Sequence, residues 1–435
     1  MFSAPQESEL PPLDTQWVST DRWVGVLDGA AYRIEVPRNW NGRLLVWARG
    51  YWNGTSLYLE NPYIRRYLLE QGFAWAASSY TRNLYDVNAA IEDSNRLVRA
   101  FTSIAATRGR ALAAPQRVYI AGWSMGGHVA AAAVEDEVLR DAQVPWRYDG
   151  ALSLCGSVND LAWFNYVAAY QLALQQLMGQ AAEAYPSAVY SRERATLQQR
   201  VQDAALRDDT SDAAIAQLRA LTEQLSGGTR PFFREGWMDG YHHNLLFSLL
   251  MNGSPQLDGV LSRNALDTRD VVYRFTDNVD ANALSFNSRV FRVTPEPEAN
   301  PLQPRGLRWV PRGAGQLAAP VMSLHTLGDL TVPLSAQQEF RRRVRAQGRE
   351  ALLVQRLVRD SGHCSFTQAE VARALDDLVA WVEVRRVPGG DDVLDAAALR
   401  SDQAGCRFTD SRSQPGDRTD ANHRAQIQAN YPACR

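Results

Sequence analysis

The chain has 435 residues, a length that favours one large domain carrying an insertion over a single compact core. Hydrophobic residues make up 45% and charged residues 22% of the sequence, as is typical of a globular enzyme. The net charge of −2 argues against a nucleic-acid partner, and no apolar stretch approaches the roughly 18 residues of a membrane span.

The first part of the chain alternates between strand-like and helix-like segments. The runs 23–27 and 31–36 flank Asp28-Gly29-Ala30 and predict an opening hairpin. Further strand-like runs lie at 44–48, 73–78, 117–121 and 151–154, with helical patterns at 64–71, 87–108 and 127–137. This alternation predicts a parallel sheet with helices packed on it.

A serine between glycines follows the run 117–121. Gly122-Trp123-Ser124-Met125-Gly126 stands between that run and the alanine-rich helical segment. Gly-x-Ser-x-Gly in this setting is typical of a nucleophile elbow, whose sharp turn lifts the serine hydroxyl clear of the sheet. The flanking positions of such a turn tolerate little beyond hydrogen at Cβ, which explains the glycines. Ser124 is the predicted nucleophile, and an ordinary structural turn is the alternative.

The alternating pattern stops near residue 158 and resumes near residue 319. The stretch between is mostly helical in pattern, with Asp212 as a helix cap and Gly227-Gly228 as a break. The sequence therefore predicts a core made of 18–158 and 316–388, interrupted by a separate unit at 159–315. That unit is rich in aromatic residues, among them Trp163, Tyr166 and Tyr170. Their helical spacing favours packing over pocket lining, and a side domain remote from any substrate is the alternative.

A serine nucleophile needs a base, and the base needs an orienting acid. His363 stands on a loop directly after the strand-like run 352–358, which suits the base. Asp329 follows the strand-like run 321–326 and is the predicted acid. Asp360 is the competing carboxylate, but it lies only three residues before His363 and belongs to the same loop, which makes an opposing geometry harder.

The five other histidines fit the role of base less well. His128 lies on a helix one turn after the serine, His325 lies inside an apolar run, and His423 lies in a polar tail. His242 and His243 form a pair in a helical region, where metal binding is the functional alternative. No carboxylate or cysteine stands at ligand spacing beside the pair, so no metal site is predicted.

The chain order Ser124, Asp329, His363, with the motifs Gly328-Asp329-x-x-Val332-Pro333 and Gly362-His363, resembles that of the α/β-hydrolase superfamily. The resemblance covers about residues 20–160 and 316–386, and the stretch 72–80 is similar to the fourth strand of bacterial secreted members. It implies an α/β-hydrolase fold, with a mostly parallel sheet of about eight strands, helices on both faces, and neither a metal nor an organic cofactor. It also implies that the mainly helical insertion forms a cap over the active site, and it leaves the substrate open.

The oxyanion hole of this fold combines the N–H after the nucleophile with one from the loop after the third strand. Met125 is the candidate for the first donor. In the second loop, Arg49-Gly50 stands where many members carry His-Gly, so the N–H of Tyr51 is the second candidate and an ordinary turn is the alternative. Trp123, beside the nucleophile, and Tyr80, at a strand end, are the expected substrate contacts.

The four cysteines predict two disulfides. The tail at 389–435 is polar and buries little, which indicates an irregular segment closed by Cys406–Cys434. Cys364, directly after the predicted base, is similar to a cysteine of feruloyl-esterase and tannase-type enzymes, which pairs with one directly before the serine. In this chain Trp123 stands directly before the serine, so the disulfide that the resemblance implies for Cys364 is expected to form with Cys155 instead. Four reduced cysteines are the alternative.

These features predict a serine hydrolase that cleaves carboxylic esters through an acyl-enzyme, acting on a small-molecule or polymeric ester with an aromatic or apolar group. Amide or peptide hydrolysis on the same triad is one alternative, and a non-catalytic binding module on a hydrolase scaffold is another. The polar N-terminus, 1–15, lacks an apolar signal core and resembles a mature secreted or periplasmic N-terminus, although a cytoplasmic start looks the same. The sequence leaves the oligomeric state open.

Overall fold

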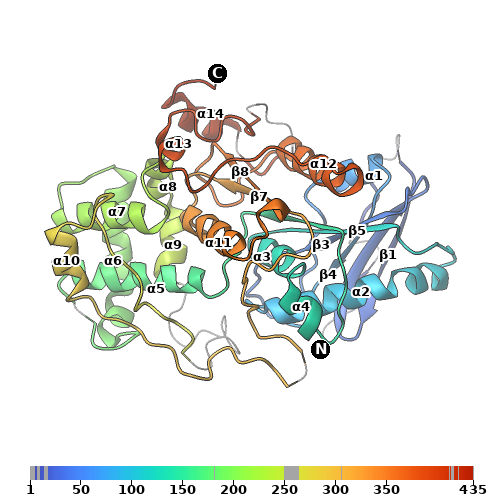
Figure 1. Cartoon of the computed structure of the whole chain (residues 1–435), viewed down its shortest axis with the longest axis horizontal. Coiled ribbons are helices and arrows are strands. Elements are labelled where there is room, and N and C mark those ends of the chain that lie inside the picture. Colours follow the sequence, from blue (N-terminus) through green and yellow to red (C-terminus); the bar gives the residue numbers. More distant parts are fainter. Residues whose placement is uncertain are drawn as a thin grey trace.

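The computed structural model describes residues 5–6, 10–13, 18–180, 182–248, 264–304, 306–410, 412, 416–419 and 421–434. The expectations for 1–15, for the insertion and for the tail therefore fall partly outside the described residues. Figure 1 shows a central sheet between helices, a helical unit beside it and a C-terminal segment above the last strands. Among the described helices, none is long and apolar enough to cross a membrane.

The described part of the chain forms one sheet of eight strands in the order β1-β2-β4-β3-β5-β6-β7-β8. The strands are β1 (Thr20–Leu27), β2 (Ala30–Pro37), β3 (Arg43–Ala48), β4 (Ala74–Ser78), β5 (Arg117–Trp123), β6 (Gly150–Leu154), β7 (Val321–Thr326) and β8 (Leu353–Val358). Strand β2 runs antiparallel to β1 and β4, and all other neighbours are parallel. Asp28 and Gly29 have φ of 47° and 88°, as the tight turn of a hairpin requires. The predicted hairpin and parallel sheet are confirmed.

Helices cover both faces of the sheet because successive side chains of a strand point to opposite sides. Leu44 and Val46 of β3 pack with α2 and α3, whereas Leu45 and Trp47 pack with α1 and α12. The helices of the core are α1 (Arg65–Glu70), α2 (Val87–Thr107), α3 (Met125–Ala132), α4 (Asp136–Asp141), α11 (Leu334–Ala346) and α12 (Gln368–Val384). The alanine-rich segment at 127–137, predicted as one helix, is divided between α3 and α4, because Glu135 leaves the helix to form a bridge with Leu317.

The insertion is helical throughout its described elements. These are α5 (Ala162–Leu177), α6 (Ala188–Leu206), α7 (Ala213–Leu225), α8 (Phe233–Met238), α9 (Gly240–Ser248) and α10 (Ala281–Asn287). Asp212 caps α7, as expected, by accepting the N–H groups of Ala214 and Ile215. Two side chains of α5 connect the insertion to the loop after β7: the indole of Trp163 donates to the Thr331 carbonyl (2.6 Å) and the Tyr166 hydroxyl donates to that of Leu330 (3.1 Å).

The C-terminal segment packs more closely than its polar sequence indicates. It contains α13 (Ala396–Arg400) and α14 (Ala421–Ala429), and the disulfide Cys406–Cys434 is present. Apolar side chains from this segment, including Leu399 and Ile427, are buried against Leu327 and Leu357 of the core. The expectation of an irregular tail that buries little was wrong, because widely spaced apolar residues converge when the segment folds over the sheet edge.

Candidate active site

Ser124 occupies the sharp turn between β5 and α3, with φ of 54° and ψ of −122°. A left-handed φ is rare for a residue with a side chain and marks a strained, functionally constrained position. The turn also brings backbones together so closely that a Cβ at Gly122 or Gly126 would overlap the carbonyl oxygen of Ala48. The glycines around the serine therefore have a direct steric cause.

Three side chains from distant parts of the sequence meet at the carboxyl ends of the strands. His363, on the loop after β8, has Nε2 2.9 Å from the Ser124 hydroxyl and Nδ1 2.6 Å from Oδ2 of Asp329. Asp329, on the loop after β7, is fully buried, and its Oδ1 accepts the N–H groups of Thr331 (2.8 Å) and Val332 (3.1 Å). This geometry allows the imidazole to take the serine proton while the carboxylate holds the ring.

The environment of Asp329 keeps its carboxyl ionised. Burial raises the pKa of this carboxyl, but the nearby imidazoles of His363, His242 and His325 and the hydrogen bond from His363 outweigh burial. The pKa of Asp329 therefore lies below its ordinary value. A buried carboxylate of this kind stabilises the positive charge that develops on the imidazole during proton transfer.

The competing carboxylate, Asp360, is engaged elsewhere. It forms an ion pair with Arg424 of α14 (3.2 Å) and accepts the N–H of Gly362 (3.0 Å). Arg424 also donates to Glu370 at the start of α12 (2.9 Å). The C-terminal segment thus fixes both flanks of the loop that carries His363.

His128 and His325 are buried neutral groups, and neither takes part in the hydrogen bonds that join Ser124, His363 and Asp329. Nδ1 of His128 lies 2.9 Å from the Tyr85 hydroxyl, and burial, followed by the charge of Arg343, lowers the pKa of this histidine to about 3. Burial is also the main cause that lowers the pKa of His325 to about 4. The side chain of His423 lies outside the described residues. His242 and His243 are both buried in the insertion.

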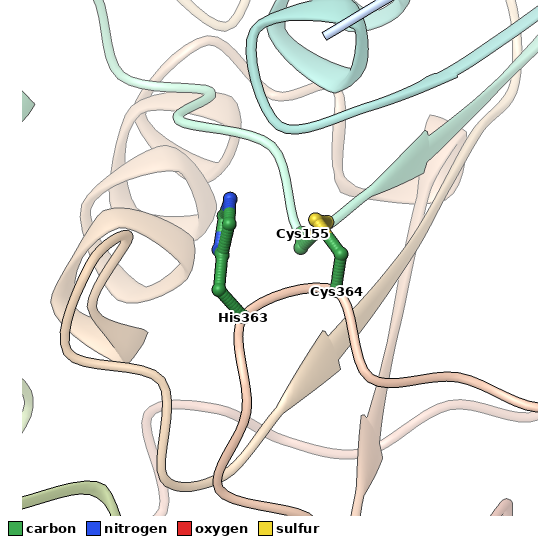
Figure 2. Close-up of side chains that lie close together, drawn as sticks. All are labelled: Cys155, His363 and Cys364. Carbon is green, nitrogen blue, oxygen red and sulfur yellow. A yellow bond between two sulfur atoms is a disulfide. The ribbon is translucent and has the colours of Figure 1, made fainter. Parts of the chain in front are cut away.

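A disulfide ties the histidine loop to the sheet. Figure 2 shows His363 and Cys364 on one loop, with Cys364 bonded to Cys155 at the end of β6. The two Cα atoms are 5.3 Å apart. Within the described residues these three side chains are also the one group at metal-ligand spacing, but a sulfur in a disulfide is not a thiolate ligand. The bond therefore fixes the backbone directly after His363.

Ser124 and His363 line a cavity of about 590 Å³, a size that suits a small-molecule ligand. Loops of the core form one part of its wall, and α5 and α9 of the insertion form another. The insertion residues are Trp163, Phe164, Asp239, Tyr241 and Leu245. The Tyr241 ring stacks on the imidazole of His363 with centroids 6.4 Å apart and an interplanar angle of 19°. Helix α9 therefore covers one face of the predicted base.

The residues predicted for the oxyanion hole lie around the serine. Met125 begins α3, so its N–H has no partner within the helix. Tyr51 lines the cavity. The buried guanidinium of Arg49, which stands where many α/β-hydrolases carry histidine, donates to the carbonyls of Ser79 (2.8 Å) and Gly50 (2.9 Å). Arg49 thus fixes the loop that carries Tyr51.

The two expected substrate contacts have different surroundings. Trp123 lines the cavity, whereas Tyr80 does not. Tyr80 is fully buried in the cluster on the α2 face, its hydroxyl donates to the Arg49 carbonyl (3.3 Å), and the Arg49 guanidinium lies over its ring at 4.5 Å. The expectation that Tyr80 contacts a ligand was wrong, because a position at a strand end does not determine on which side the ring packs.

The cavity also contains charged residues that the sequence did not single out. Arg418, from the C-terminal segment, lies over the Trp123 ring at 3.7 Å, and its backbone N–H donates to the Tyr63 hydroxyl (2.7 Å). Glu60 lines the same cavity, and burial raises the pKa of its carboxyl despite a hydrogen bond from Trp47. No local motif marks Arg418, and the predicted Cys406–Cys434 bond is the sole sequence feature that draws attention to its segment.

The strand order, the elbow after β5 and the chain order of serine, aspartate and histidine together decide the fold. The chain has the α/β-hydrolase fold.

No protein-family model matches the chain. It is similar to an o-phthalyl amidase from Xanthobacter agilis, with 25% identity over 431 residues that cover 86% of this chain and 90% of the relative. A solved feruloyl esterase B from Aspergillus oryzae is 12% identical, with a TM-score of 0.48 over 87% of this chain and 83% of that chain. An esterase from the same fungus is 12% identical, with a TM-score of 0.45 over 85% and 81%.

Proposed function

We propose that this chain is a serine hydrolase that cleaves carboxylic esters through an acyl-enzyme. The observation that carries the proposal is the continuous hydrogen-bonded line from Ser124 through His363 to Asp329 in the wall of the cavity. A non-catalytic binding module has no need of a strained serine aligned with an imidazole and a buried carboxylate.

In this mechanism the Ser124 hydroxyl attacks the ester carbonyl while Nε2 of His363 takes its proton. Asp329 stabilises the imidazolium, and the N–H groups of Met125 and Tyr51 donate to the oxyanion. The alcohol leaves with the proton from His363. Water then attacks the acyl-enzyme and gives one proton to the same imidazole, and His363 returns that proton to the Ser124 oxygen as the ester bond breaks and the acid product leaves.

Aromatic side chains support an aromatic or apolar group on the substrate. The rings of Trp52 and Tyr58 stack at 4.7 Å, and both line the cavity together with Trp123 and Tyr241. Flat apolar walls of this kind suit an aromatic acyl or alcohol group. Arg418, above Trp123, adds a cation that suits a carboxylate on such a group.

Amide hydrolysis is the second candidate, because the curated relative is an o-phthalyl amidase, a name that describes an aromatic acyl group on an amide. Esters and amides undergo the same acyl transfer, so the triad serves both. We further propose that the insertion at 159–315 acts as a cap, because α5 and α9 line the cavity. The two disulfides support a secreted or periplasmic location.

The proposal is tested with Ser124→Ala on matched p-nitrophenyl ester and p-nitroanilide substrates of one aromatic acid. Loss of the nucleophile is expected to lower kcat at least about a thousandfold with the fold intact. A fluorophosphonate probe is expected to label the wild type and not the variant. Wild-type turnover in the variant, or no labelling of the wild type, would contradict the proposal. The ratio of ester to anilide rates in the wild type decides between the two candidates.

A further inference from the structure

Helix α9 brings a second histidine to Asp329. His242 has no exposed surface, and its Nε2 lies 3.7 Å from Oδ1 of Asp329. Its Nδ1 lies 2.9 Å from the carbonyl oxygen of Gly236. Within the described part of the chain, Nε2 has no hydrogen-bond partner. A fully buried ring nitrogen therefore faces the carboxylate of the triad at ion-pair distance.

The surroundings of His242 determine where its protons lie. The Gly236 carbonyl only accepts hydrogen bonds, so Nδ1 carries a proton. In a neutral ring, Nε2 would then present a lone pair to a carboxylate, which is repulsive. With a second proton, the ring presents an N–H and a positive charge to Asp329, and the contact becomes attractive. Both ring nitrogens of His242 therefore face oxygen acceptors, and two N–H donors would match these acceptors better than one.

We propose that His242 is a positioning residue, through which the insertion holds the carboxylate of Asp329 in place for His363. The proposal rests on the proposed serine-hydrolase function. Oδ2 of Asp329 is bonded to His363, while Oδ1 is held by two backbone N–H groups and faces His242. The insertion thus contributes to the support of the catalytic line as well as covering the cavity.

The neighbouring residue, His243, provides a matched comparison. It is equally buried, and its Nε2 lies 2.6 Å from the carbonyl oxygen of Trp237, but no ion pair joins it to Asp329 among the described residues. Burial lowers the pKa of His243 to about 4. The other titratable groups that interact with Asp329 or with this histidine pair are His363, His325, Arg230, Tyr166, Tyr241 and Asp239. Each of these groups is present in both single variants, so differences between the variants report on the contact with Asp329.

Removal of the His242 side chain has two expected effects. The carboxylate loses one of its supports, so His363 is held less well and kcat falls. The carboxylate also loses a positive neighbour, so its full negative charge stabilises the imidazolium of His363 and the base is protonated at higher pH. The acidic limb of the kcat/KM profile is therefore expected to move to higher pH, an effect that a merely structural role would not produce.

The experiment compares His242→Gln with His243→Gln in the full chain, using a p-nitrophenyl ester between pH 4 and 9. For His242→Gln we expect kcat to fall about 10- to 100-fold, the cost of a slightly misplaced catalytic group, with the acidic limb displaced upward. For His243→Gln we expect the acidic limb of the kcat/KM profile to lie at the same pH as in the wild type. Thermal unfolding of both variants reports whether each is folded. Coinciding pH profiles for the two folded variants would overturn the proposal.

A wild-type measurement covers the case in which His242→Gln does not fold. The chain has six histidines, so a ¹⁵N-histidine NMR spectrum is simple enough to resolve the rings. One ring protonated on both nitrogens at pH 7 supports the proposal, and six neutral rings overturn it. Failure of the proposed function is distinguished separately: in that case the wild type hydrolyses no ester or amide, or Ser124→Ala remains active.

Discussion

Removal of the Cys155–Cys364 disulfide separates two roles that the bond combines: stabilising the fold and positioning the base. The bond joins residues 209 apart in sequence, so it excludes many open conformations of the unfolded chain. The loop-entropy relation gives a ceiling of about 5.4 kcal/mol for a closed loop of 209 residues at 25 °C. The Cys406–Cys434 bond, with a separation of 28, has a ceiling of about 3.6 kcal/mol.

The two disulfides differ more in how close they lie to His363 and Ser124 than in the upper limit of the stabilisation that each can provide. Cys364 directly follows His363, and its partner ends the strand next to the nucleophile strand. We expect Cys155→Ala/Cys364→Ala to destabilise the fold and also to lower kcat about 10- to 100-fold, because the base loses the covalent anchor of its backbone. We expect Cys406→Ala/Cys434→Ala to destabilise the fold with a much smaller loss of kcat, because the apolar cluster around Leu399 and Ile427 still holds the segment.

The assay measures urea unfolding and p-nitrophenyl ester turnover on the wild type and both double variants. Turnover is compared under conditions in which all three proteins are fully folded, so that the kcat values report on the site alone. Equal kcat losses in the two double variants, or wild-type kcat without Cys155–Cys364, would refute the reasoning that this bond positions His363.

Three further changes have expected outcomes. Asp329→Asn should lower kcat about 10⁴-fold. Because folding lowers the pKa of Asp329, the ionised carboxylate stabilises the fold above the ordinary aspartate pKa, and this stabilisation is lost as the pH falls through the pKa of the folded state. Urea unfolding should therefore show a smaller difference in unfolding free energy between the wild type and the variant at pH 3 than at pH 6. Arg424→Gln leaves two buried carboxylates, Asp360 and Glu370, without their cation and should cost about 3–5 kcal/mol of unfolding free energy, whereas the same change at exposed Arg412 should leave it nearly unchanged. Arg418→Ala should raise KM for an aromatic ester bearing a carboxylate more than for its neutral analogue, and equal KM changes would contradict a role in recognising that carboxylate.

The parts of the site that follow directly after strands were predictable from the sequence. Parallel strands bring their carboxyl ends to one edge, so Ser124, Asp329 and His363, each after a strand, were expected there, and the structure brings them to hydrogen-bond distance. A position along a strand does not determine the direction of a side chain beyond its end. Tyr80 is buried for that reason, while Trp123 lines the cavity.

The contributions of the insertion and of the C-terminal segment were not predictable in the same way. His242 had no sequence signal beyond a pair of adjacent histidines, because its contact with Asp329 depends on how α9 docks. Arg418 and Arg424 stand in a polar sequence that resembles solvent-exposed tail, and their positions depend on the docking of that segment against the core. Tertiary packing of this kind leaves no periodic pattern for a sequence-based prediction to use.

The ion pairs of Arg424 have a consequence for the timing of assembly during synthesis. The nucleophile turn is translated early, and its strand and helix pack on neighbours that precede or closely follow it. The loop that carries His363 gains this ion-pair support only after α14 has been synthesised, because Arg424 is the partner of both Asp360 and Glu370. A nascent chain that has not reached α14 therefore contains the serine turn but lacks the cation that pairs with Asp360 and Glu370 on the two sides of the histidine loop.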